Sequence, residues 1–141
     1  MRKRHPRGIV DTSVVIGFER IDPDDLPAEL AISAVTLAEL AAGPHASADP
    51  AERVRRQDRL QRTEASFDPL PVDAAVARAY GRVYAAFAAA GQKARGRRAL
   101  DLQIAATALA TGLPLYTRNA DDLRALGGLL EIVAVEPAGN A

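Results

Sequence analysis

The sequence contains no cysteine and only two histidines, His5 and His45. Disulfide bonds and thiolate zinc sites are therefore excluded, and a zinc site built from histidines has too few ligands. Tryptophan is also absent, and only three tyrosines and three phenylalanines occur. So few aromatic rings argue against a surface that binds single-stranded nucleic acid by stacking its bases.

Long hydrophobic runs are missing too, although 48% of the residues are hydrophobic. Charged or amide side chains interrupt the most apolar stretches, so we expect no membrane-spanning segment. The basic start of the chain is followed by only two apolar residues, Ile9 and Val10, before Asp11. This stretch is too short for a secretion signal, and we expect a cytoplasmic protein without membrane contact.

A chain of 141 residues is the usual size of one domain with its own core. We expect a basic extension at residues 1–7, a single domain at residues 8–137 and a short tail at residues 138–141. The formal net charge is zero, so only local charge is informative about partners.

Strands and helices are expected to alternate along the chain. The apolar patterns predict strands at residues 8–10, 30–33, 113–117 and 130–135, and a brief edge strand at residues 67–72. Predicted helices begin at Ser13, Thr36, about Pro50, Val72, near Leu100 and at Asp121. This order favours an α/β fold with a mainly parallel, about five-stranded sheet and helices on both faces.

Four acidic positions, Asp11, Glu39, Asp101 and Asp122, lie where apolar runs meet turns or helix starts. In open parallel sheets, ligands bind at the carboxyl ends of the strands, and we expect these acids to converge there, with Asp101 in the first turn of its helix. Two carboxylates ~4 Å apart repel by about 4 kcal/mol at an effective dielectric near 20. Such a cluster favours a cation, and oxygen ligands favour Mg²⁺ or Mn²⁺.

Each acid also has a simpler interpretation. Thr36-x-x-Glu39 matches a capping box, and Asn119-x-x-Asp122 matches an N-cap with an acid at the third helical position. Asp101 lies at the border of a buried helix face, where an unpaired carboxylate is costly. Asp11 directly follows a strand, and Ser13 already offers a cap. A functional cluster explains all four acids together better than four separate caps.

Four segments of the chain, in this order, resemble the motifs of PIN-domain nucleases and, more narrowly, of VapC toxins from VapBC toxin–antitoxin pairs. These segments are Ile9-Val10-Asp11-Thr12-Ser13, Thr36-Leu37-Ala38-Glu39-Leu40, the Asp101 helix with Ile104-Ala105-Ala106, and Tyr116-Thr117-Arg118-Asn119-x-x-Asp122. The resemblance extends from Gly8 to about Pro137. It implies a three-layer α/β/α sandwich.

The resemblance also implies roles for individual residues. Asp11 and Asp101 would hold the metal, Glu39 would complete the site, and Asp122 would be the fourth acid, with Asp121 as the other possibility. Supporting polar groups would come from Thr12, Ser13, Thr117 and Asn119.

The implied protein is an Mg²⁺-dependent endoribonuclease, with Mn²⁺ as a substitute, that cleaves cellular RNA and so inhibits translation and growth. A cognate VapB-type antitoxin would block the acidic cleft. The resemblance further implies a homodimer and a toxin–antitoxin hetero-oligomer, and the apolar segments near Phe18 and Leu40 could supply a surface for it.

An acidic cleft repels RNA, so basic residues must offset that repulsion. Lys93, Arg95, Arg97 and Arg98 lie in a glycine-flanked segment that leads to Asp101. Positive charge at a helix N-terminus opposes the helix dipole, and phosphate contact explains these residues better than helix stability does. Another basic set, Arg55, Arg59 and Arg62, alternates with acids and is expected to be a solvated face.

Two other classes of protein fit part of the pattern. A catalytically inactive domain of the same fold could bind partners only. A receiver-like phospho-acceptor domain also has strand-end acids and Mg²⁺, but it needs a strand-end lysine, and here Arg118 follows Thr117.

Overall fold

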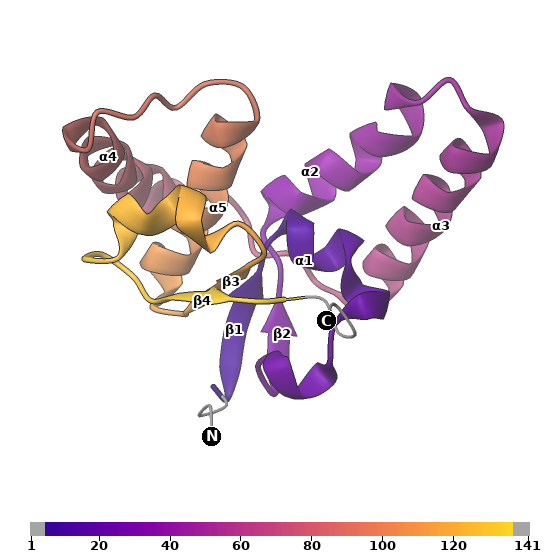
Figure 1. Ribbon diagram of the computed structural model, residues 1–141, viewed down its shortest axis with the longest axis horizontal. Coiled ribbons are helices and arrows are strands. Elements are labelled where there is room, and N and C mark those ends of the chain that lie inside the picture. Colours follow the sequence, from indigo (N-terminus) through magenta and orange to yellow (C-terminus); the bar gives the residue numbers. More distant parts are fainter. Residues whose placement is uncertain (1–4, 137–141) are drawn as a thin grey trace.

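The central sheet of the computed structural model has four strands in the order β2-β1-β3-β4, and every neighbouring pair is parallel (Figure 1). The structure describes residues 5–136. The strands are β1 (Arg7–Val10), β2 (Glu29–Ala31), β3 (Leu115–Thr117) and β4 (Ile132–Ala134). The parallel sheet is as predicted, but β1 begins inside the expected basic extension, and the sheet has four strands rather than about five.

The predicted edge strand at residues 67–72 forms only an isolated bridge between Leu70 and Ser33. The Leu70 amide donates to the Ile32 carbonyl at 2.9 Å, and the Leu70 carbonyl accepts from the Ala34 amide at 2.9 Å. Pro69 and Pro71 on either side have no amide hydrogen to donate, so the pairing cannot extend beyond one residue.

Helices cover both faces of the sheet, as predicted, because successive residues of β1 point to opposite sides. Ile9 belongs to a buried cluster with residues of α4 (Ala74–Ala89) and α5 (Arg97–Thr111). Val10 belongs to a second cluster with Val14 of α1 (Thr12–Ile16) and Tyr116 of β3. Two cores separated by one sheet give the three-layer α/β/α arrangement.

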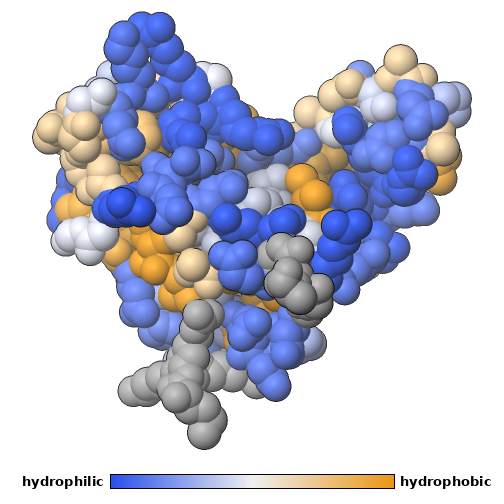
Figure 2. Space-filling model, in the orientation of Figure 1, coloured by the Kyte–Doolittle hydropathy of each residue, from blue (hydrophilic) through white to orange (hydrophobic). Residues whose placement is uncertain are grey.

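A helical arm extends from the sheet on one side of the molecule (Figure 1). It consists of α2 (Ala34–Ala42), a 3₁₀ turn η3 (Gly43–Ala46) and α3 (Pro50–Ser66). Helix α3 begins at Pro50, as predicted, with proline in its first turn. Figure 2 shows a notch between this arm and the part of the molecule that contains α4 and α5.

The starts of four predicted helices are wrong. Asp11 rather than Ser13 caps α1, and Ser33 caps α2, which begins at Ala34 rather than Thr36. Helix α4 begins at Ala74, leaving Val72 outside. Helix α5 begins at Arg97 after Gly96, whose φ of 55° is a left-handed value that favours glycine. Asp101 therefore lies in the second turn of α5 and not in the first.

The remaining segments are three 3₁₀ turns: η1 (Phe18–Arg20), η2 (Pro23–Asp25) and η4 (Ala120–Leu126). The last of these replaces the short helix predicted at residues 121–126. Leu40, expected near a dimer surface, is only 5% exposed and packs in the second core, so only Phe18 of that pair is available at the surface. No helix within residues 5–136 is both long and apolar enough to cross a membrane.

Candidate active site at the carboxyl ends of the strands

Asp11 lies at the carboxyl end of β1 and is 6% exposed. Its Oδ1 accepts hydrogen bonds from the Val14 amide at 3.2 Å and from the Ser13 hydroxyl at 2.6 Å. Burial raises the pKa of Asp11 above its usual value, although hydrogen bonds from Ser13, Thr117 and the Val14 amide act in the opposite direction. Asp11 is thus both a helix cap and a buried carboxylate whose charge is poorly solvated.

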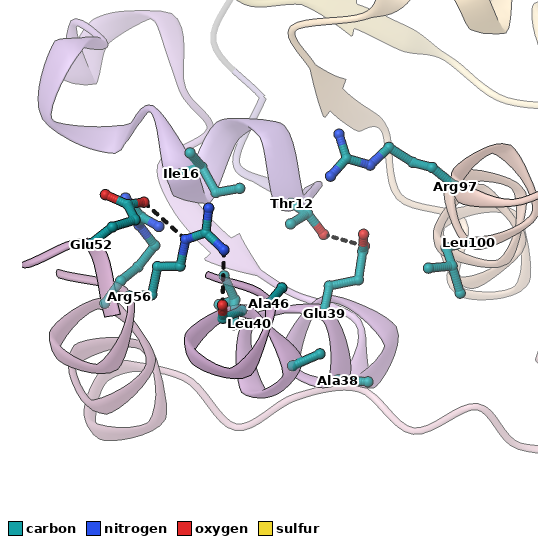
Figure 3. A pocket seen from close by; sticks show the side chains of 13 residues that line it. Thr12, Ile16, Ala38, Glu39, Leu40, Ala46, Glu52, Arg56, Arg97 and Leu100 are labelled. Carbon is teal, nitrogen blue, oxygen red and sulfur yellow. Dashed lines mark hydrogen bonds and ion pairs between the residues drawn. The ribbon is translucent and has the colours of Figure 1, made fainter. Parts of the chain in front are cut away.

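Glu39 extends from α2 toward the start of α1. The Thr12 hydroxyl donates to Glu39 Oε1 at 2.7 Å (Figure 3). The same hydroxyl lies 3.0 Å from the Thr36 hydroxyl oxygen. Because Ser33 is the cap of α2, Glu39 lies well inside the helix and cannot close a capping box on Thr36. The capping alternative for Glu39 is therefore wrong.

Asp101 of α5 is the most perturbed acid in the cleft, with a pKa raised from 3.8 to about 6. Burial is the main cause, and the negative charges of Asp11 and Glu39 add to it, whereas Arg98 and Arg97 lower the pKa. Carboxylates from β1, α2 and α5 thus act on one another electrostatically. These three elements are far apart in the sequence, and the sheet brings them together.

Arg98 connects Asp101 to the fourth predicted acid. Its guanidinium nitrogens lie 3.4 Å from Asp101 Oδ2 and 3.4 Å from Asp122 Oδ2. Asp121 instead pairs with Arg124 at 2.8 Å, and its side chain is 93% exposed. Of the two neighbouring acids, Asp122 is therefore the one connected to the cleft.

The predicted supporting residues lie at the same edge of the sheet. Ser13 Oγ accepts the Arg118 amide hydrogen at 3.1 Å, which directs the Ser13 proton toward Asp11. Thr117 Oγ1 accepts the Asn119 amide hydrogen at 3.0 Å, and the Thr117 side chain also bonds Asp11. Asn119 occupies the N-cap position of η4, with Asp121 and Asp122 in the first turn as predicted, but its side chain forms no capping hydrogen bond.

The predicted basic residues divide into two groups. Lys93 and Arg95 are exposed in the loop before α5, and no acid of residues 5–136 pairs with them. Arg97 and Arg98 belong to α5 itself rather than to the loop. Arg97 extends from α5 toward Thr12 (Figure 3).

Two cavities adjoin the acids. The larger, about 570 Å³, is mainly apolar and lies between α1, α2, α3 and the start of α5, with Thr12, Glu39, Arg56 and Arg97 in its wall. The second, about 420 Å³, contains Ser13, Arg97, Arg118 and Asn119. Sequence reasoning assigned no site role to Arg56 or Arg118, and only the motif position of Arg118 beside Thr117 pointed to it.

The acids suit a divalent cation chemically. All are oxygen donors, and burial raises the pKa values of two of them, Asp11 and Asp101, with a smaller contribution from neighbouring charges at Asp101. As they stand, no three acidic or histidine side chains within residues 5–136 are arranged as a ligand set. Arg98 currently supplies the positive charge beside Asp101 and Asp122.

Comparison with known proteins gives one consistent family. The PIN domain family matches residues 9–129. Ribonuclease VapC5 of Mycobacterium tuberculosis is 38% identical over 91% of this chain and 95% of its own length. Ribonuclease VapC8 of the same species is 39% identical over 72% of this chain and 89% of its own.

Solved structures agree with this result. The crystal structure of VapBC-5, a toxin–antitoxin system of Mycobacterium tuberculosis, matches with a TM-score of 0.80 and 38% identity, covering 92% of this chain and 99% of that one. VapBC2 from Rickettsia felis, bound to a promoter DNA fragment, matches with a TM-score of 0.71, covering 89% of this chain and 96% of that one. At 22% identity, the second match supports the fold alone.

Proposed function

This chain belongs to the PIN-domain family and to its VapC group, and from that premise we propose that it is a metal-dependent endoribonuclease, the toxin of a toxin–antitoxin pair. The observation that carries the proposal is the convergence of Asp11, Glu39 and Asp101 in one cleft, where burial, together with the negative charges of Asp11 and Glu39, raises the pKa of Asp101 to about 6. Charges kept together at such a cost are typical of functional sites. The 38% identity to a ribonuclease supports RNA as the substrate.

We assign Asp11 and Asp101 as the metal ligands, with Glu39 and Asp122 completing the site. Mg²⁺ is the proposed ion, with Mn²⁺ as a substitute, because both prefer oxygen ligands. When bound, such an ion lowers the pKa of water and stabilises charge on the phosphodiester oxygens.

The protein's own residues orient these acids. Ser13 and Thr117 hold the Asp11 carboxylate in place. Thr12 holds Glu39 through Oε1, and Oε2 forms no hydrogen bond within residues 5–136. Glu39 Oε2 is therefore the proposed acceptor of a proton from the attacking water. Because water rather than the ribose 2′-hydroxyl attacks, the cleaved RNA carries a 5′-phosphate.

A cognate antitoxin is the proposed protein partner, as the titles of the matching VapBC complexes indicate for those proteins. The 570 Å³ cavity beside Glu39 has the apolar lining that suits an antitoxin segment with apolar side chains. Such a segment would cover one side of the acidic cleft and exclude RNA. A homodimer and a cytoplasmic location are further parts of the proposal.

The test compares wild type with Asp11→Asn on total cellular RNA with Mg²⁺. Asparagine caps a helix about as well as aspartate, so the variant keeps the N-cap of α1 and removes the charge. Cleavage is expected to fall by about 100-fold or more, and to stop in chelator. Sequencing the new RNA ends identifies the cleavage site.

Equal cleavage by both proteins, or cleavage that persists in chelator, would contradict the proposal. Binding of Mn²⁺ without any RNA turnover would instead select the inactive binding domain.

A further inference from the structure

The 420 Å³ cavity beside Asp11 contains two arginines on different elements, Arg97 at the start of α5 and Arg118 after β3. Ser13, which donates to Asp11, is part of the same wall. Through Ser13 the cavity adjoins the acidic cleft, and it shares Ile16 and Arg97 with the wall of the apolar cavity.

The structure fixes the position of Arg118. Its amide donates to Ser13 Oγ, which itself donates to Asp11, so only one side chain separates the Arg118 backbone from the buried carboxylate. Its guanidinium lies over Gly17, where an added Cβ would come within 2.7 Å of Arg118 Nη1. Because Gly17 has no side chain, the Arg118 side chain can lie against the end of α1.

Neither arginine forms an ion pair with an acid among residues 5–136, whereas Arg98 and Arg124 do. Arg98 pairs with Asp101 and Asp122, and Arg124 pairs with Asp121. Glu136 also lies in the wall of the cavity but forms no ion pair with Arg97 or Arg118. Two guanidinium groups that form no ion pair within residues 5–136 therefore border a cleft whose own charge is negative, and Arg97 acts on Asp101 only at longer range.

The geometry points to Arg97 and Arg118 as the pair that binds the RNA backbone phosphates next to the cleaved bond. This inference rests on the proposed function and names the residues that hold its substrate. A planar guanidinium donates two parallel hydrogen bonds to one phosphate, and its charge offsets the repulsion between RNA and the acids. Arg98, predicted with Arg97 as an RNA-binding residue, is excluded from the pair because it already neutralises the acids.

The test measures binding of a short fluorescein-labelled single-stranded RNA of mixed sequence to full-length Asp11→Asn protein at several salt concentrations. Adding Arg97→Gln or Arg118→Gln is expected to raise Kd roughly tenfold. Each should lower the slope of log K against log salt by about 0.7, the value for one phosphate contact on a single strand. Arg82→Gln, an exposed arginine of α4, is the matched control and should change neither quantity.

Two more variants separate position from charge. Gly17→Ala keeps every charge, and its φ of −93° suits alanine, but the new Cβ displaces Arg118. Weaker RNA binding is therefore expected from Gly17→Ala. Arg118→Lys keeps the charge but loses the planar fork, so its Kd should lie between those of the parent and Arg118→Gln.

Cleavage by wild type, together with Kd values for Arg97→Gln and Arg118→Gln that match Arg82→Gln, would overturn this inference and leave the proposed function standing. Absence of both cleavage and RNA binding would overturn the two together. Circular dichroism of each variant confirms that the fold is intact before binding is compared.

Discussion

Glu52 and Asp101 are both carboxylates with arginines nearby, yet their pKa values shift in opposite directions. Glu52, at the start of α3, accepts from Arg55 at 2.8 Å and from Arg56 at 2.9 Å, and these hydrogen bonds lower its pKa. Within residues 5–136, Asp101 has only Arg98 as an ion-pair partner, at 3.4 Å, and burial raises its pKa to about 6.

The difference lies in how each region supplies positive charge. On α3, the acid and its partners are three and four residues apart on one helix, and each pair forms locally. In the cleft, four acids come from different elements, and Arg98 is shared between two of them, Asp101 and Asp122. At the start of α3, arginines of the same helix balance the charge of Glu52. In the cleft, the acids outnumber their arginine partners and need positive charge from a bound ion or molecule.

Asp101→Asn is expected to give the largest effect on stability. The pKa in the folded protein lies above the ordinary value of 3.8, so the ionised group destabilises the fold. This destabilisation by the ionised Asp101 is absent below about pH 4 and reaches its full size above about pH 7. In chelator, the variant should gain up to about 3 kcal/mol of unfolding free energy at the higher pH and almost nothing at the lower.

Urea unfolding at the two pH values measures this change, with Asp121→Asn as the exposed control. A gain of the same size at both pH values would show that the charge of Asp101 is not its source. Mn²⁺ should stabilise wild type more than Asp101→Asn, because the variant lacks a proposed ligand.

Arg98→Met sharpens the comparison by removing the only arginine paired with the cleft acids in the described residues. If Arg98 competes with the metal for Asp101 and Asp122, its loss should strengthen Mn²⁺ binding about three- to tenfold. Calorimetric titration measures this affinity, and Arg124→Met is the matched control because Arg124 pairs with exposed Asp121. Weaker Mn²⁺ binding would mean that Arg98 positions the acids instead.

Glu52→Gln should have the smallest effect. The ion pairs of Glu52 are at the surface of α3, where such pairs contribute little, so the melting temperature should fall by no more than about 2 °C. RNA cleavage should not change. A loss of activity comparable to that of Asp11→Asn would mean that the two regions are not independent.

The sequence was sufficient to predict a mainly parallel sheet with helices on both faces, and acids at the carboxyl ends of its strands. Its apolar runs set the strands, and Pro50 marked the start of α3 correctly. It failed at helix starts because Ser33 and Thr36 both match the preferred cap residues, and tertiary structure decides between them. The Thr36 hydroxyl lies against Thr12, whereas Ser33 Oγ accepts from the Val35 amide at 3.0 Å and caps the helix.

The contacts of the arginines in the site could not be predicted from the sequence either. The three-residue spacing of Arg98 and Asp101 was visible in the sequence, but contact with Asp122 depends on how η4 packs beside α5. The path of Arg118 across Gly17 joins residues about a hundred positions apart, and no local pattern reports it. Assignment of individual site residues needed the three-dimensional arrangement.

Asp11 holds the first turn of α1 with the same carboxylate that faces the cleft. A genetic selection for cells that survive expression of this protein would therefore recover two kinds of substitution at one codon. Asparagine would yield a folded protein that cannot cleave RNA but still binds its antitoxin. Valine or alanine would leave α1 without its cap. Only the asparagine variant would compete with active toxin for the antitoxin and so release active toxin from inhibition.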